Sequence, residues 1–248
     1  MSEVVDFVTL RGEYVSLFLV AGALALAGRR VATLLRLPPG EVGDLFWNVG
    51  IAFVVVARLG YLAIESPDSL LDPLVLIRLQ GGLQPFLGVL AAVAVVGWRT
   101  RGEHGLSEAR LGWLAVAAAG FVIATVTYDA ACVARDACYG AEAPAPFGFA
   151  MSGLSATRMA TPLMEATLLL IGTGLLFASR LSSAQALLAL GGVAALLRAA
   201  LTPASVRGMA AVGAETLAFV VLGLLLLGLV AWHDRAYRES QDVVPNEQ

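Results

Sequence analysis

The apolar residues of this chain fall into seven long runs, separated by short polar or helix-breaking segments. The runs cover about residues 14–35, 42–64, 83–98, 111–127, 162–178, 184–201 and 209–232. A helix crosses the hydrocarbon core of a bilayer with about 20 residues, and most of these runs approach that length. A further apolar stretch at 73–79 is too short to span, so we expect it to re-enter or to lie at the interface. The pattern predicts an all-α, polytopic membrane protein with seven transmembrane helices in a single domain, 1–248.

The composition agrees with this class. Charged residues make up 14% of the chain and hydrophobic residues 58%, whereas soluble domains carry about 25% charged residues. The net charge of -3 gives no reason to expect a nucleic-acid partner. Residues 1–12 lack the basic region of a cleavable signal, so we expect no processed leader. With the orientation that the arginines predict, these residues form an outer N-terminal segment. Residues 233–248 are polar, and we expect a disordered cytoplasmic tail there.

The arginines predict the orientation, because cytoplasmic loops carry an excess of positive charge. The chain has no lysine. Segments on one side hold Arg29, Arg30, Arg36, Arg99, Arg101, Arg110, Arg180, Arg235 and Arg238, against Arg11, Arg78, Arg135, Arg158, Arg198 and Arg207 on the other. The larger group favours an outer N-terminus and a cytoplasmic C-terminus. Trp98, Trp113 and Trp232 then fall at inner ends of spans, where interfacial anchors belong.

The stretch 128–165 contains the longest break between apolar runs, both cysteines and several charges near the membrane. Asp129, Arg135 and Asp136 surround Cys132 and Cys138. These charges could bind a polar headgroup, or they could pair with one another and hold a re-entrant loop. On the outer side the cysteines could form a disulfide or remain buried thiols. Their spacing is not that of a zinc site, and we expect no metal or other cofactor.

Other ionisable residues lie inside the apolar runs, where they are costly and therefore candidates for function. Glu165 lies one turn into its run, and Arg158 is its first candidate partner, with Arg58 and Arg198 as alternatives. Arg198 could also oppose Glu215. Arg58 either extends to the interface or has a functional role. Structural ion pairs would also explain all of these residues. Gly81, Gly82 and Gly88 permit close approach of a helix or a ligand, and helix packing is the simpler explanation for Gly88.

Several local motifs occur in the order found in one enzyme family. Tyr14 opens the first span, and Ala57-Arg58-Leu59-Gly60-Tyr61 ends the second. Asp72-Pro73-Leu74 and Arg78-Leu79-Gln80-Gly81-Gly82-Leu83 lead into the third. Cys132 and Ala137-Cys138-Tyr139-Gly140 follow the fourth, and Arg158 and Leu163-Met164-Glu165 begin the fifth. Over about residues 14–201 the chain resembles the prolipoprotein diacylglyceryl transferases, seven-span enzymes of the bacterial inner (cytoplasmic) membrane.

The resemblance implies transfer of a diacylglyceryl group from phosphatidylglycerol to the lipobox cysteine of a preprolipoprotein signal peptide. It assigns catalytic roles to Arg58, Arg158 and Glu165. It assigns substrate binding, in a cavity open to lipid, to Tyr14, Gly81, Gly82, Arg135, Gly140 and Arg198. One of the three arginines Arg58, Arg158 and Arg198 would hold the glycerol-phosphate leaving group, and Glu165 would orient that arginine.

Departures from the family pattern give a reason to keep a second hypothesis beside the transferase. Phe86 stands where the family has a histidine, and phenylalanine cannot relay a proton. Asp129 stands where the family has a signature arginine, which reverses the charge offered to a phosphate. Met164 replaces a tyrosine. The sixth-span arginine is matched only loosely, by Ala194 or, one turn later, by Arg198. The alternative is therefore a non-catalytic relative that binds a lipid or a membrane-protein partner. A transporter is less favoured, because the chain shows no paired broken helices in two matching halves.

Overall fold

The computed structural model describes residues 2–68, 83–101, 108–134, 140–143, 148–150, 157–179, 181–201 and 209–242. Within these ranges the chain forms seven helices and one two-stranded sheet. The helices are α1 (Ser2–Leu35), α2 (Pro39–Glu65), α4 (Pro85–Arg99), α5 (Glu108–Ala134), α6 (Thr161–Phe177), α7 (Ser183–Leu201) and α8 (Met209–Asp242), and the strands are β1 (Gly148–Phe149) and β2 (Arg158–Met159).

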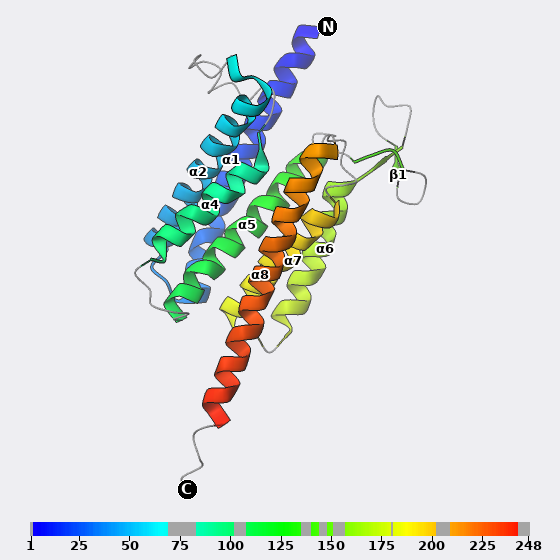
Figure 1. Ribbon diagram of the computed structural model, residues 1–248. Coiled ribbons are helices and arrows are strands. Elements are labelled where there is room, and N and C mark those ends of the chain that lie inside the picture. Colours follow the sequence, from blue (N-terminus) through cyan, green and yellow to red (C-terminus); the bar gives the residue numbers. More distant parts are fainter. Residues whose placement is uncertain are drawn as a thin grey trace.

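Successive helices run in opposite directions between the two ends of one bundle (Figure 1). We call these the N end, where α1 begins, and the C end, where α8 ends. The N end thus also holds the ends of α2, α5 and α7 and the starts of α4, α6 and α8. The short sheet lies at the N end, beside α6 (Figure 1).

Five of the described helices are long and apolar enough to cross a membrane. They contain the candidate spans Val15–Leu35, Pro39–Glu65, Ala109–Ala134, Ser183–Leu201 and Thr216–Arg235, while α4 and α6 are shorter apolar helices. The outer surface of the bundle carries many large apolar side chains, among them Phe18, Leu26, Leu170 and Leu175. Such a surface suits lipid rather than water, because soluble monomers rarely expose large contiguous apolar patches. The chain is therefore a multi-pass, all-helical membrane protein.

Three helices extend beyond their apolar runs. The fourth run ends near residue 127, but α5 continues to Ala134 and includes the first part of the expected outer loop. The expected polar segments at the two ends are also helical, from Ser2 in α1 and to Asp242 in α8. No proline interrupts these segments, and Gly12 is their one glycine. The hydrophobic pattern therefore indicates the apolar part of each helix. The polar residues beyond it include almost no helix breaker, so the helix continues through them.

The predicted break after the first run is a sharp turn. Arg36 has a positive φ of 56°. The amide of Leu37 donates to the carbonyl of Ala32 at 2.9 Å, and that of Arg36 donates to Thr33 at 3.3 Å. This is the Schellman pattern, which satisfies carbonyls at a helix end. Because Pro39 then occupies the first position of α2, the chain reverses within four residues.

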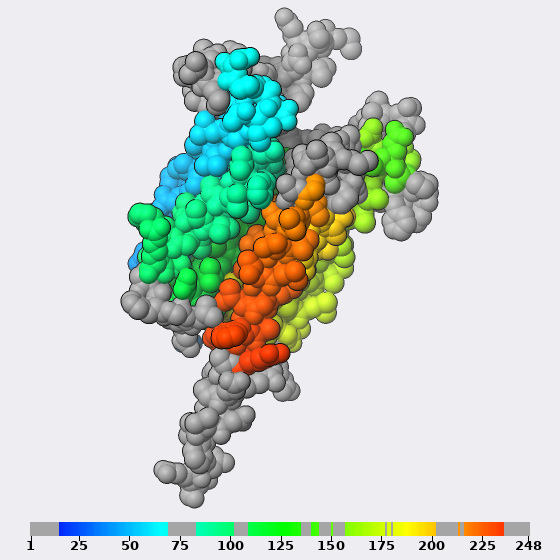
Figure 2. Space-filling model, viewed as in Figure 1, coloured from blue at the N-terminus to red at the C-terminus, as the bar shows by residue number. Residues whose placement is uncertain are grey.

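Small residues bring the helices close together. Gly191 of α7 faces Ala118 of α5, and Gly192 faces Gly223 of α8. On the other side of the bundle, Gly88 of α4 lies against Phe53 of α2, so its helix-packing role is confirmed. Membrane helices associate mainly through such close packing, since lipid supplies no hydrophobic drive for their contact. In Figure 2, α4 and α8 lie side by side on the visible face of the bundle.

Two apolar clusters are relevant to the site. The larger joins α1, α2, α4, α5 and α7 and includes Phe46, Val116 and Leu188. The smaller lies between α5, α6 and α7 and consists of Val122, Leu169, Leu190 and Ala194.

Candidate functional site

Three ionisable residues from three helices meet at the N end of the bundle. Nη1 of Arg198, in the last turn of α7, lies 2.6 Å from Oε2 of Glu165 and 3.4 Å from Oδ1 of Asp129. Glu165 lies near the start of α6, and Asp129 lies near the end of α5. One guanidinium nitrogen therefore contacts two carboxylates. We call these three residues the ionic cluster.

The helical repeat explains why the three side chains converge. Asp129 follows Val122 by seven residues, Glu165 precedes Leu169 by four, and Arg198 follows Ala194 by four. Residues separated by four or seven positions share a helix face. Val122, Leu169 and Ala194 pack together between α5, α6 and α7. The ionic cluster therefore occupies the N-end continuation of this apolar seam.

The two carboxylates are almost completely enclosed. Their side chains are each 2% exposed, while that of Arg198 is 31% exposed. Oδ2 of Asp129 and Oε1 of Glu165 have no hydrogen-bond partner among the described residues. A buried carboxylate normally has all its oxygens paired, because an unpaired buried charge is costly. The cluster thus combines two acids, one cation and two unsatisfied acceptor oxygens.

The partner of Glu165 differs from the first candidate. Glu165 contacts Arg198, which was one of the alternatives, and not Arg158. Nη2 of Arg158 instead lies 3.8 Å from Oε1 of Glu142. Arg158 belongs to β2, which precedes α6, and the sheet directs it toward residue 142. The alternative pairing of Arg198 with Glu215 lies outside the described side chains.

In the described part of the structure, the three candidate arginines contact different groups. Arg198 is held by two carboxylates and Arg158 lies beside Glu142. Arg58 is buried in α2, with its guanidinium carbon 5.5 Å from the centre of the Tyr61 ring. An arginine that extends to the membrane interface would be exposed, and Arg58 is buried. Its burial argues against extension to the interface, the first of the two interpretations of this residue.

The segment before α6 is a small antiparallel arrangement. The amide of Gly140 donates to the carbonyl of Met159 at 2.8 Å, and the amide of Met159 donates to Ala141 at 3.0 Å. Phe149 of β1 pairs with Arg158 of β2. Gly140 is therefore part of the backbone pairing that positions Arg158 just before α6.

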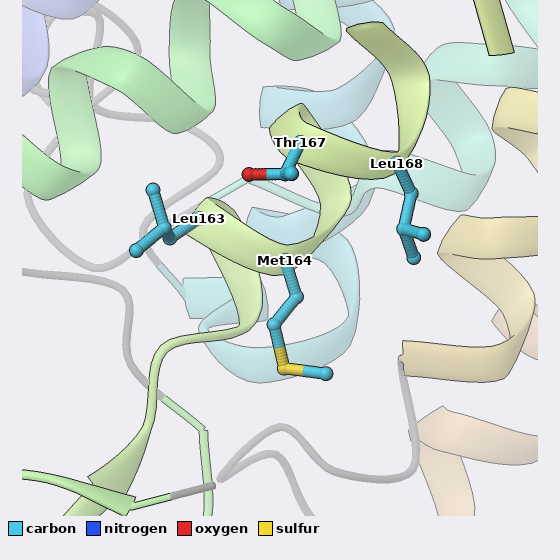
Figure 3. Close-up of a pocket in the computed structure, with 4 residues that line it drawn as sticks. All are labelled: Leu163, Met164, Thr167 and Leu168. Atoms are coloured by element: carbon cyan, nitrogen blue, oxygen red, sulfur yellow. The ribbon is translucent and has the colours of Figure 1, made fainter. Parts of the chain in front are cut away.

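A shallow apolar hollow of about 320 Å³ lies on the first two turns of α6 (Figure 3). It is lined by Leu163, Met164, Thr167 and Leu168. These residues lie at i, i+1, i+4 and i+5, so they share one side of the helix. Leu163 and Leu168 are exposed, whereas Glu165 is buried on the side that faces α5 and α7.

The other sequence candidates are only partly described. Tyr14 lies in α1, and its side chain is outside the described part of the structure, as are Gly81, Gly82, Arg135, Asp136 and Cys138. Phe86 is half-buried in the first turn of α4. Cys132 is buried and disulfide-bonded. In the described ranges, no group of three or more His, Cys, Asp or Glu residues is placed to hold a metal ion.

Sequence reasoning recognised Glu165 and Arg198 but missed the role of Asp129 as their neighbour. The signal that could have located it is its spacing of seven residues from Val122, which places it on the buried face of α5. Comparison of the chain with protein-family models finds no match, and comparison with curated proteins finds none either.

Proposed function

We propose that this protein is a divergent, non-catalytic relative of the prolipoprotein diacylglyceryl transferases, and that it binds an anionic phospholipid at the N end of α6. The ordered motifs from Tyr14 to Glu165 support the relationship, and phosphatidylglycerol is the lipid that the relationship suggests. The proposal rests chiefly on one observation. A cationic side chain with an unsatisfied donor, Arg158, immediately precedes a helix whose first turns carry an apolar hollow.

The chemistry of this region suits the two parts of a phospholipid. Nε of Arg158 is buried and has no hydrogen-bond partner in the described ranges. Arginine binds phosphate through charge-assisted hydrogen bonds, and the N-terminus of α6 adds the favourable end of its helix dipole. The side chains of Leu163 and Leu168 offer apolar surface to an acyl chain. Glu142 competes only weakly for Arg158, because the Glu142 side chain is largely exposed.

The contacts of the ionic cluster support lipid binding without transfer of the diacylglyceryl group. Transfer of the diacylglyceryl group requires cations that stabilise the departing phosphate. Arg198 is instead engaged by Glu165 and Asp129, so its charge is offset within the cluster and is not directed at a phosphate. Asp129 would repel a phosphate where the family has an arginine. Phe86 offers no group for proton transfer where the family has a histidine.

The binding proposal is tested by titrating a short-chain phosphatidylglycerol into purified protein and counting bound lipids by native mass spectrometry. Hydrogen bonds to charged groups contribute about 1.5–3 kcal/mol. We therefore expect Arg158→Gln to weaken binding roughly tenfold. The matched control is Arg99→Gln, which removes an arginine from the C end, where it pairs with Glu41. Equal affinity of the wild type and Arg158→Gln would contradict the proposed site.

A second candidate function is the transfer reaction itself. It is favoured by Arg58, a buried cation next to an aromatic ring in the last part of α2, toward the N end of the bundle. The test is transfer of labelled diacylglyceryl from phosphatidylglycerol to a lipobox peptide by protein in detergent, compared with a heat-killed control. Transfer that is lost in Arg58→Gln would support this second function. If protein that binds lipid shows no transfer, the non-catalytic proposal stands.

A further inference from the structure

The ionic cluster has an imbalance of charge that its own residues do not remove. Asp129 and Glu165 supply two negative charges when ionised, and both contact the same nitrogen of Arg198. No other charged side chain forms an ion pair with either carboxylate among the described residues. In the described part of the chain, the charged groups facing Asp129 are thus Glu165 from α6 and Arg198 from α7. Among these three side chains one arginine offsets one carboxylate, so two ionised acids would leave the cluster with a net negative charge.

The surroundings make that charge expensive. The cluster borders the apolar seam of Val122, Leu169 and Ala194, and both carboxyl side chains are 98% inaccessible to solvent. Ionised groups at membrane depth are costly unless they are paired. Two carboxylates that share one site cannot readily both be ionised, because their like charges repel in a medium of low dielectric constant. The structure therefore calls for one additional positive charge at this position.

We propose that Asp129 and Glu165 share one bound proton, which makes the cluster of two acids and Arg198 electrically neutral. The proton lies on one of the two oxygens that lack a partner, Oδ2 of Asp129 or Oε1 of Glu165. A protonated carboxyl becomes a hydrogen-bond donor, which a carboxylate is not. The ligand of this site is thus a proton, and the site is separate from the proposed lipid site at Arg158.

A metal ion fits the same oxygens less well. Calcium and magnesium take six or more oxygen ligands. Two carboxyl oxygens remain available here, and the described residues hold no third acid, histidine or cysteine placed to complete a metal site. Arg198 also lies within hydrogen-bond distance of one oxygen of each acid and would repel a metal cation. A proton needs a single oxygen and no coordination shell.

The proposal is tested by infrared spectroscopy of the full chain in lipid nanodiscs at neutral pH, where a protonated carboxyl has its own C=O stretching band. We expect this band in the wild type. We expect both Asp129→Asn and Glu165→Gln to remove it, because either variant leaves one acid, which then ionises against Arg198. If the proton belonged to one acid alone, the band would persist in the variant that alters the other acid. Glu41→Gln, which alters an exposed pair at the C end, should leave the band unchanged.

Removing the cation gives a second readout. Arg198→Gln should increase the band about twofold, because both acids must then carry protons to remain neutral. Absence of the band in the wild type would overturn the proposal, as would its persistence in either single-acid variant. Spectra are recorded in choline and in sodium salts. A band that is present in choline but lost in sodium would show that a sodium ion takes the place of the proton. This result would also overturn the proposal.

Discussion

At the scale of single residues, Arg198 has the clearest structural role. Two buried carboxyl groups on two different helices contact its Nη1 atom. Removing one partner from a buried ion pair is much more costly than the net stabilisation from the intact pair, because the charge that remains must stay uncompensated or be neutralised by taking up a proton. Removing the Arg198 side chain should therefore weaken the packing of α5, α6 and α7 against one another.

We predict that Arg198→Gln lowers the free energy of unfolding by about 3 kcal/mol, the lower end of the range for a broken buried pair, since Arg198 is partly exposed. Unfolding by denaturant in mixed micelles measures this change. The matched control, Arg99→Gln, breaks an exposed pair with Glu41 and should cost at most about 1 kcal/mol.

A double-mutant cycle separates the charge effect from loss of packing. Glu165→Gln should cost less in the Arg198→Gln background than in the wild type, because the partner charge is already absent. Additive effects of the two substitutions would show that the contact between these side chains does not contribute to stability.

From the sequence, the residues that belong to this site were easier to predict than the contacts between them. Glu165 and Arg198 were recognisable because each is an ionisable residue in an apolar run. Their pairing was only one of three possibilities, since periodicity gives the buried face of a helix but not its neighbour. Asp129 was expected in an irregular loop because the apolar run before it ends near residue 127. It lies instead in α5, where helix geometry directs it toward α6 and α7.

At the scale of helices, the contact between α7 and α8 depends on two glycines. A Cβ atom added to Gly223 would lie 2.9 Å from the carbonyl oxygen of Gly192 and 2.7 Å from Cγ of Leu196. The backbone oxygen cannot move without shifting α7. The two helices therefore approach one another at a distance that only glycine permits.

We predict that Gly223→Ala lowers the free energy of unfolding by about 1–3 kcal/mol, as overpacking usually does. Gly228→Ala is the control on the same helix, because a Cβ there meets nothing within 4 Å. It should be neutral or slightly stabilising, since alanine has the higher helix propensity. Thermal unfolding of the two variants in the same detergent gives the comparison. Equal melting temperatures would mean that α8 shifts to accommodate the methyl group.

Helix positions were predictable where the chain carries a strong local signal. The helix-breaking pair Pro38-Pro39 separates α1 from α2, which begins at Pro39, three residues before its apolar run. The start of α7 lies within one residue of its apolar run. The ends of α5 and α8 were not predictable in this way, because polar residues without proline or glycine continue a helix as readily as they end it. Hydrophobicity indicates which part of a helix contacts lipid or protein interior, not where the hydrogen-bonded backbone stops.

At the scale of the whole molecule, the distribution of charge distinguishes the two ends of the bundle. The arginines at the C end whose side chains are described are Arg29, Arg30, Arg36, Arg99, Arg101, Arg110 and Arg235. Two of them pack against aromatic rings, with the guanidinium of Arg99 4.4 Å from the Trp113 ring and that of Arg101 4.2 Å from the Trp98 ring. Trp98 and Trp232 are exposed, as interfacial anchors are, but Trp113 is buried and stacks with Arg99 instead.

This asymmetry predicts that the C end faces the cytoplasm and the N end faces outward. Because α1 begins at one end and α8 finishes at the other (Figure 1), reporter domains fused to the two termini should lie on opposite sides of the membrane. A reporter active only outside should work at the N-terminus, and one active only inside should work at the C-terminus. The ionic cluster and Arg158, both at the N end, would then face the outer leaflet. If both reporters lay on the same side, one of the short helices α4 and α6 would not cross the membrane, and the proposed lipid site would need a new position.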